Sequence, residues 1–398
     1  MFEFFEGLIE KLGVRLVSNF TEKLMDFIKN VKQNSNNENN DNGGYMAQIG
    51  SSGNSTQIGS SGDMAQIGSS GDRAQIGSSG YGAQIGSSGY RAQIGSNGDR
   101  ARIGSSGDRA QIGSSGDRAQ IGSSGDMAQI GSSGDWAQIG SSGYRARIVS
   151  SGYRAQIGSS GDMAQIGSSG DRARIGSSGY MVQIDINGNS SVGFACGYKS
   201  IIKAKKGTWI SLCEYEQDEN DNYIPSFAIS SQIGNKDYKD FKGRILKETE
   251  YYTLHNKQLY PVDLSDDIKT IKISEKKRKG IIIIKGLDLY DTDEEIYIVK
   301  EKDLSAHGET LKEAMDDLIY KKTQNEEIEN IVSEIKRTGK VNRAQYRAIT
   351  GACQYGTNKF CEEHNIQDLE EISLEELRKI LINDYGAEKF WNLVDKEV

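Results

Sequence analysis

The amino-acid sequence predicts a mainly β protein whose longest part is a parallel β-solenoid. The first observation is a nine-residue unit, x-Ala-Gln-Ile-Gly-Ser-Ser-Gly-Asp, whose isoleucine recurs at every ninth position from Ile49 to Ile184. The second is that Ala (position 2) and Ile (position 4) share one face of an extended segment, while Gln (position 3) takes the other. The third is the Gly-Ser-Ser-Gly that follows each isoleucine, because its small residues suit a turn.

One strand and one turn per unit predict a coil of 18 residues made from two units. Sixteen units then predict eight coils over residues 46–190, a rod of roughly 38 Å at about 4.8 Å per stacked strand. The same composition is typical of a disordered Gly/Ser tract. The unbroken isoleucine register, the alternation and the absence of Pro favour the solenoid.

Side-chain burial alone does not hold such a coil together. Two buried Ile contribute on the order of 3–6 kcal/mol, whereas ordering 18 backbone units costs about 18–36 kcal/mol. Backbone ladders and stacking of like residues must supply the rest, and the two end coils need covering.

Residues 1–32 are predicted to form an amphipathic helical segment, followed by a polar linker over residues 33–45. Apolar side chains recur at three- and four-residue steps from Phe5 to Val31, with an interruption near Gly13. We expect this stripe to pack against the next domain or against its copy in a homo-oligomer. Contact with a membrane surface stays open as an alternative, although the polar face mixes Glu with Lys.

Residues 191–304 are expected to form a capping coil and a small β domain. WISLCEYE and YIPSFAIS, on either side of the acidic QDENDN, predict a hairpin. EYYTLHNKQLYPV, GIIIIK and EIYIVK predict further strands.

Residues 305–398 predict an α-helical module with readable helix starts. Three pairs have the spacing of a capping box or a close variant: Thr310 with Glu313, Asn342 with Gln345, and Ser373 with Glu376.

Several stretches of the chain resemble proteins of bacteriophages and prophages. HGETLKEAMDDL (307–318), YRAITGACQYG (346–356) and YGAEKF (385–390) resemble a module that closes many such proteins, often behind leucine-rich or short β-solenoid repeats. The GSSGD-x-AQI repeats and KAKKGTWISLCEY resemble the same group, which extends the likeness through most of the chain after residue 46. The group has no established activity, so the resemblance implies origin and architecture and carries over no catalytic residue.

Charge and cysteine content limit the function and the location. A net charge of −8 argues against general nucleic-acid binding. Four cysteines without a CxxC pair indicate neither a zinc knuckle nor a disulfide framework. The N-terminus carries Glu where a secretory signal needs a basic start, and no stretch reaches the roughly 18 apolar residues of a membrane span. We therefore expect a cytoplasmic protein of an infected or lysogenic bacterial host, with association with the virion as an alternative.

No metal or cofactor is expected. Calcium-binding nonapeptide repeats use G-G-x-G-x-D turns, whereas here Asp directly follows the second Gly and Tyr replaces it in several units. Ice binding is disfavoured by bulky outward Gln and Arg. Mimicry of DNA is disfavoured because residues 46–184 hold 11 Arg against 9 Asp, a charge of 11 − 9 = +2.

The candidate interaction residues are aromatic side chains at the turns, Arg in place of Gln, and a basic turn at 272–280. They are Tyr81, Tyr90, Arg102, Trp136, Tyr144, Arg147, Tyr153, Arg174, Lys276, Lys277 and Arg278.

Catalysis has one weak candidate, a nucleophile and base pair of Cys353 and His307. The favoured interpretation is a non-enzymatic scaffold, spacer or interaction protein that binds a protein partner and forms homo-oligomers through the N-terminal helix or a solenoid face. Two alternatives stay open: an inhibitor of a host defence protein or ligand acting through residues 190–398, and an enzyme that uses the C-terminal module.

Overall fold

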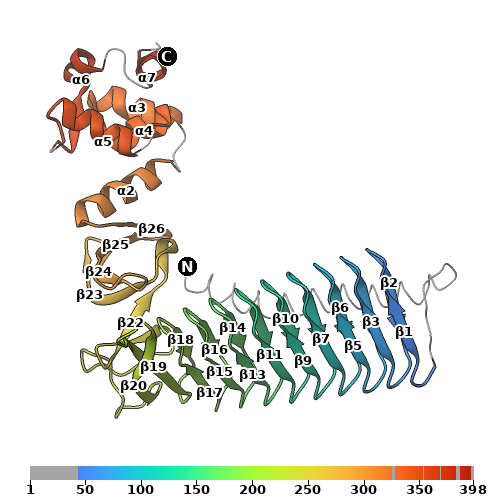
Figure 1. Ribbon diagram of the computed structural model, residues 1–398. Coiled ribbons are helices and arrows are strands. Elements are labelled where there is room, and N and C mark those ends of the chain that lie inside the picture. Colours follow the sequence, from blue (N-terminus) through green and yellow to red (C-terminus); the bar gives the residue numbers. More distant parts are fainter. Residues whose placement is uncertain (1–43, 325–327, 353, 368, 382–385, 396–398) are drawn as a thin grey trace. The chain divides into compact units, whose positions relative to one another are not determined.

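The protein is described by a computed structural model that covers residues 44–324, 328–352, 354–367, 369–381 and 386–395. It comprises two compact units, the first ending at Val262 and the second beginning at Asp263. Figure 1 shows the stacked strands of the first unit and the antiparallel strands and helices of the second. The predicted helical segment over residues 1–32 lies outside the described residues.

The predicted parallel β-solenoid is confirmed, with 18 residues per coil and about nine turns. Each repeat contributes one four-residue strand, and alternate strands belong to two sheets. Sheet A begins with β1 (Gln48–Ser51), β3 (Gln66–Ser69), β5 (Gln84–Ser87), β7 (Arg102–Ser105), β9 (Gln120–Ser123), β11 (Gln138–Ser141), β13 (Gln156–Ser159) and β15 (Arg174–Ser177). Sheet B begins with β2 (Gln57–Ser60), β4 (Gln75–Ser78), β6 (Gln93–Ser96), β8 (Gln111–Ser114), β10 (Gln129–Ser132), β12 (Arg147–Ser150), β14 (Gln165–Ser168) and β16 (Gln183–Ile186).

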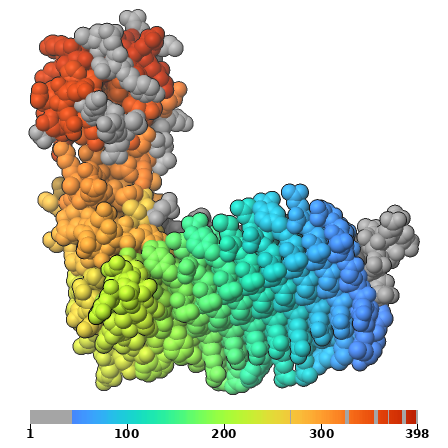
Figure 2. Space-filling model, viewed as in Figure 1, coloured from blue at the N-terminus to red at the C-terminus, as the bar shows by residue number. Residues whose placement is uncertain are grey.

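Every strand lies in register on the strand one coil away, so identical residues form continuous rows. Ile103, for example, lies opposite Ile85 on one side and Ile121 on the other. The isoleucines and the position 2 alanines are buried, as the alternation predicts. Figure 2 shows the successive coils as closely packed bands from blue to green.

The stack continues past the last regular repeat, which gives about nine turns where the sequence predicts eight. β17 (Val192–Ala195) and β19 (Trp209–Gln217) extend sheet A, and β18 (Ile201–Ala204) extends sheet B. Backbone pairing does not require identical side chains, so the coils persist after the period dissolves.

The glycine at position 8 is where one coil rests on the next. A Cβ on Gly116 would lie 2.1 Å from the carbonyl oxygen of Gly98, and the corresponding distances along both turn rows are equally short. No side chain fits there, because the neighbouring atom is backbone and cannot move aside.

The turn also provides hydrogen bonds between coils beyond the strand ladders. The backbone N–H of Arg118 donates to the carbonyl of Asp135 (2.7 Å), one coil further on. The carboxylate of Asp117 accepts the backbone N–H of Asp135 (2.8 Å), and the amide oxygen of Asn54 accepts that of Asp72 in the same way (2.9 Å). Asp at position 9 therefore satisfies the turn of the following coil.

Position 1 adopts a left-handed backbone conformation in coil after coil. Arg118 has φ 58° and Trp136 has φ 61°, and Gly82 is the one glycine among the repeats at this position. This conformation costs an L-residue roughly 1–2 kcal/mol. The bonds to both neighbouring coils hold the residue in it.

Two hairpins complete the first unit. β20 (Tyr223–Gln232) pairs antiparallel with β19, which forms the predicted hairpin around QDENDN. β21 (Tyr251–His255) pairs antiparallel with β18 and with β22 (Gln258–Asp263). Where sheet B ends, buried Asp185 pairs with Lys203 (3.0 Å) and accepts the hydroxyl of Tyr251 (3.2 Å), which offsets the cost of burying the carboxylate.

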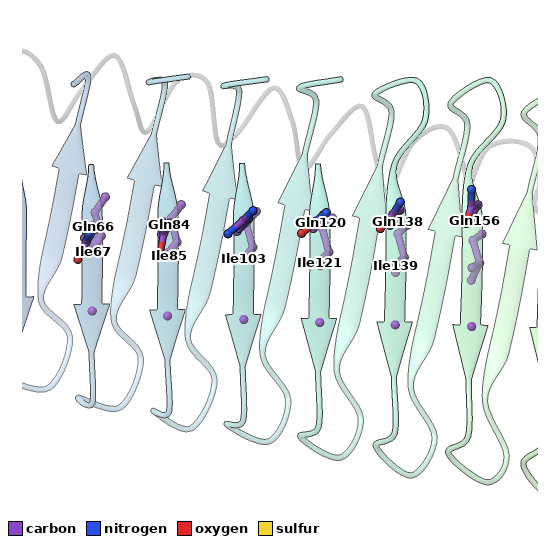
Figure 3. A pocket seen from close by; sticks show the side chains of 18 of the residues that line it. Gln66, Ile67, Gln84, Ile85, Ile103, Gln120, Ile121, Gln138, Ile139 and Gln156 are labelled. Atoms are coloured by element: carbon purple, nitrogen blue, oxygen red, sulfur yellow. The ribbon is translucent and has the colours of Figure 1, made fainter. Parts of the chain in front are cut away.

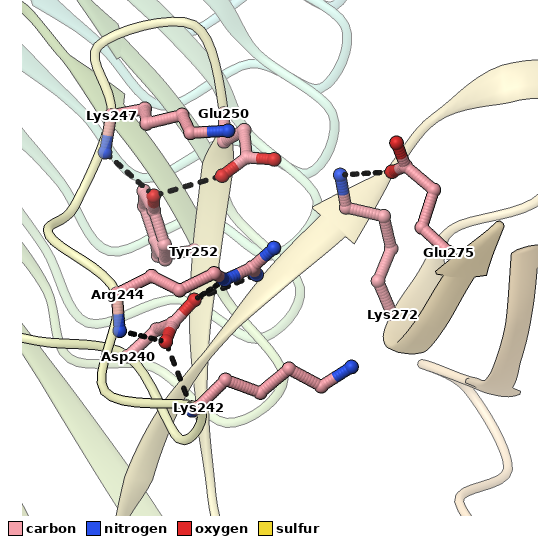
Figure 4. Close-up of polar contacts among 8 residues, drawn as sticks. All are labelled: Asp240, Lys242, Arg244, Lys247, Glu250, Tyr252, Lys272 and Glu275. Atoms are coloured by element: carbon pink, nitrogen blue, oxygen red, sulfur yellow. Dashed lines mark hydrogen bonds and ion pairs between the residues drawn. The ribbon is translucent and has the colours of Figure 1, made fainter. Parts of the chain in front are cut away.

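A buried carboxylate organises the loop before β21 (Figure 4). Asp240 accepts the backbone N–H groups of Lys242 and Arg244, both at 2.9 Å, and the guanidinium of Arg244 at 2.7 Å. The hydroxyl of Tyr252 accepts the N–H of Lys247 (2.7 Å) and donates to Glu250 (3.0 Å). These bonds fix the loop without regular secondary structure.

The second unit starts with four antiparallel strands. They are β23 (Thr270–Arg278), β24 (Ile281–Asp288), β25 (Glu295–Glu301) and β26 (Leu304–Gly308), preceded by the short helix η1 (Ser265–Asp267). Helix α2 (Leu311–Gln324) buries Ala314 and Leu318 against Val299 and Ala306. Thr310 and Glu313 form the predicted reciprocal cap at its start.

Short helices around one apolar cluster end the chain. The elements are α3 (Ile328–Thr338), β27 (Lys340–Asn342), α4 (Arg343–Thr350), α5 (Gln354–Glu363), β28 (Glu371–Ser373), α6 (Leu374–Ile380) and α7 (Ala387–Val394). Ile335, Ile349 and Phe390 lie at the centre of the cluster, fully buried. The predicted capping box of Asn342 and Gln345 is present.

We expect opposite effects from alanine at two glycines of neighbouring repeats. Gly116→Ala should destabilise the solenoid by about 4 kcal/mol or more, because its Cβ overlaps the backbone of the previous coil. Gly122→Ala at position 5 should stabilise it by roughly 0.5 kcal/mol, because no described atom lies within 4 Å of that Cβ. Urea unfolding followed by circular dichroism measures both, and equal effects would contradict the stacking argument.

The acceptor role of Asp117 predicts a second contrast. Asp117→Ala should lower the free energy of unfolding by about 1 kcal/mol, since the N–H of Asp135 loses its partner. Asp117→Asn should be close to neutral, because Asn54 already accepts the equivalent bond. A loss of similar size in both variants would show that the negative charge matters more than the acceptor.

Candidate interaction surface

The outer face of sheet A carries a continuous groove along the solenoid, which we call the trough. Its wall is the position 3 row of Gln and Arg, and its floor is the position 5 row of glycines. It has a volume of about 1280 Å³, and Phe194 takes the next place in the glycine row. Figure 3 shows the labelled glutamines and isoleucines repeating along the stack. The floor glycines are Gly50, Gly68, Gly86, Gly104, Gly122, Gly140, Gly158 and Gly176.

The trough is shaped by missing side chains. Among the described residues, a Cβ at Gly104, Gly122 or Gly140 would have no atom within 4 Å. The chemistry of the wall is that of neutral amides, which both donate and accept hydrogen bonds. Of the described residues that line the trough, only Arg102 and Arg174 are charged.

The predicted arginine candidates do not form one site. Arg102 and Arg174 stand in the trough wall on β7 and β15, with three repeats of sheet A between them. Arg147 stands on β12 in sheet B, the other face of the solenoid.

The aromatic candidates divide between the two turn rows. Tyr90 and Tyr144 belong to the row that follows sheet A strands β5 and β11 in the alternate turns, whereas Tyr81 and Tyr153 belong to the opposite row. Each tyrosine reaches the position 1 side chain of the next coil. The hydroxyl of Tyr90 accepts from Arg109 (2.9 Å), and that of Tyr144 donates to the sulfur of Met163 (3.2 Å).

One aromatic and cationic cluster forms on the solenoid, around Trp136 and Tyr153. Their ring centroids are 6.3 Å apart, and the guanidinium of Arg154 lies 4.5 Å from the Trp136 ring and 5.1 Å from the Tyr153 ring. Arg172 donates to the hydroxyl of Tyr153 (2.7 Å). These distances fit cation–π contacts.

Sequence reasoning missed the two arginines of this cluster. Arg154 and Arg172 follow Trp136 at steps of 18 residues, so they occupy the same position 1 row of consecutive coils. The coil length, applied to position 1, is the signal that would have found them.

The predicted basic turn lies on a hairpin of the second unit. Lys276, Lys277 and Arg278 are exposed at the end of β23, opposite the isoleucines of β24. Lys279 and Gly280 form the two-residue connection, both with positive φ (49° and 86°), as favoured hairpin turns require.

His307 lies at the end of β26 and contacts the carboxylate of Asp266 through Nδ1. Asp266 also pairs with Lys321. Cys353, the other member of the weak catalytic pair, lies outside the described residues.

Two cysteines that the repeat pattern did not connect lie side by side at the end of sheet A. Ala195 is paired with Leu212, so the next residues, Cys196 and Cys213, are neighbours across β17 and β19. They stand 17 residues apart, off the 18-residue period, which is why the period did not reveal them. Burial, with a hydrogen bond to Cys213 and its charge, raises the pKa of the Cys196 thiol to about 12.

Comparison of the chain with protein-family models, with curated proteins and with solved structures finds no match. Within the described ranges, no group of three or more His, Cys, Asp or Glu side chains is arranged to hold a metal ion. None of the helices in those ranges is long and apolar enough to cross a membrane.

The raised pKa of Cys196 predicts slow alkylation near neutral pH. Because the thiolate is the nucleophile, labelling by iodoacetamide should be slow at pH 7.5 and should still be rising at pH 10, where an ordinary cysteine with pKa near 8.5 has levelled off. Peptide mapping by mass spectrometry measures the rate. Cys213→Ser removes two causes of the shift and should speed the labelling of Cys196; rapid labelling of the unmodified chain at pH 7.5 would contradict the assignment.

Proposed function

We propose that this chain is a non-enzymatic bacteriophage or prophage scaffold and spacer, which binds a protein partner and holds two functional ends at a set separation. The observation that carries the proposal is the stacking of about nine near-identical coils in strict register. The likeness of GSSGD-x-AQI and HGETLKEAMDDL to phage proteins supports the origin.

The physics of the stack suits a spacer. Each coil contacts only its neighbours, so the array lengthens or shortens by whole coils without change to either end. In-register ladders along two sheets resist bending, because any bend must stretch hydrogen bonds on one side. Length therefore changes in steps of about 4.8 Å while stiffness is kept.

The protein partner is supported by the surface chemistry. Trp, Tyr and Arg dominate the binding energy of protein interfaces, and Trp136, Tyr153, Arg154 and Arg172 gather these side chains in one exposed or half-buried cluster. The trough adds a neutral face rich in amides. Both surfaces are held on rigid strands and turns, which limits the entropy lost on binding.

Deleting one coil should shorten the rod and leave its ends intact. Removal of residues 100–117 joins Asp99 to Arg118 and keeps every upstream row on its own sheet. We expect unchanged circular dichroism, a rod shortened by about 4.8 Å in solution X-ray scattering, and capture of the same proteins from host lysate by the tagged full-length chain.

Removal of residues 109–117 is the matched control, because it deletes half a coil. The solenoid should still fold, since both sheets use the same Gln-Ile-Gly-Ser strand, but every upstream row moves to the opposite sheet. Loss of the captured proteins in the whole-coil variant, with its fold intact, would overturn the spacer proposal.

A further inference from the structure

We propose that the trough on sheet A is a homodimer interface, in which the position 3 row of one copy lies in the trough of a second copy and the two solenoids run parallel. The inference is independent of the spacer function. It concerns which face pairs, and in which orientation.

The geometry of the two rows makes the face complementary to itself. The Gln row and the glycine row run along the solenoid side by side, two residues or about 6.6 Å apart. A two-fold axis between them, parallel to the solenoid axis, places each Gln row over the partner's glycine row. A two-fold axis along the strands would instead place Gln on Gln, so complementarity selects the parallel arrangement.

The floor has room for a side chain from outside. Gly104, Gly122 and Gly140 have no described atom within 4 Å of a built Cβ, over a strand face that is exposed on each of them. The chain itself accepts large residues at this position: Val149 stands in register with Gly131 and Gly167 on sheet B, and Phe194 continues the sheet A row. A partner's Gln side chain can therefore enter without displacing this chain's backbone.

The polar chemistry of the contact can be satisfied. Rows of identical amides at strand spacing can hydrogen-bond along the row, as Gln ladders do between paired sheets in tightly interdigitated interfaces. Arg102 and Arg174 interrupt the row, and their long stems can carry the charge to the rim. In the parallel dimer each arginine lies near its own copy, so like charges oppose association and added salt should strengthen it.

The area fits a dimer of modest affinity. Eight strands at about 4.8 Å and four residues at about 3.3 Å give a face of roughly 500 Å² per copy, or roughly 1000 Å² in total. That total is near the lower limit for a specific interface. Association should therefore be visible at micromolar concentration and above.

The test fills the trough with methyl groups. The full-length chain is compared with Gly104→Val/Gly122→Val/Gly140→Val in the trough and with Gly167→Val on sheet B, where Val149 is the natural precedent. Sedimentation equilibrium up to 100 µM, at low and high salt, reports mass against the 43.7 kDa monomer, and circular dichroism verifies the fold of each variant.

We expect dimers for the unmodified chain and for Gly167→Val, tighter at high salt, and at least a tenfold weaker association for the triple trough variant. A monomeric unmodified chain at 100 µM would overturn the proposal. So would a triple variant that is folded and dimerises as strongly as the unmodified chain, because the interface would then lie elsewhere.

Orientation is tested by cross-linking. Residues 46–184 contain no Lys, so Ser70→Lys/Ser178→Lys introduces unique amines six coils apart beside the trough. A parallel dimer gives cross-links of each new lysine to the same lysine of the second copy, which can only be intermolecular. Intermolecular cross-links that join position 70 to position 178 alone would overturn the parallel arrangement.

Discussion

The structure of the first unit depends on the backbone contact of one coil with the next at the position 8 glycine. A Cβ there would approach the preceding carbonyl to within about 2 Å, so the turn of each coil rests directly on the turn below. That contact sets the spacing at which the strands pair and at which the turn N–H groups find acceptors. Isoleucine and alanine then fill an interior whose width is already fixed by the backbone.

Strict stacking turns single residues into rows, and rows into surfaces. At position 9, Asp gives its carboxylate to the next turn, whereas Tyr gives up that bond and instead covers the position 1 side chain of the next coil. The exchange of Asp and Tyr thus trades an acceptor for an aromatic contact at constant backbone geometry. Local variation of the surface is compatible with an unchanged coil because side chains at the turn point away from the stack.

The same stacking explains why the two surfaces differ in character. The turns carry charged and aromatic side chains in a left-handed backbone conformation that presents them outward. Sheet A presents neutral amides beside a floor without side chains. A partner protein with its own aromatic or acidic groups suits the first surface, whereas a second copy of the same rows suits the second.

The sequence by itself determined the solenoid, its 18-residue coil, the inward Ala and Ile and the helix caps at Thr310 and Asn342, because strand alternation and helix capping are local. It did not determine the left-handed position 1, the acceptor role of Asp117, the cluster of Trp136 with Arg154, or the pairing of Cys196 with Cys213. Each of these depends on which residue lies one coil away, and for the two cysteines that offset leaves the repeat period. Only the tertiary structure decided them, because the stacking of coils, and not the order of residues along one strand, sets contacts between residues 17 to 19 apart.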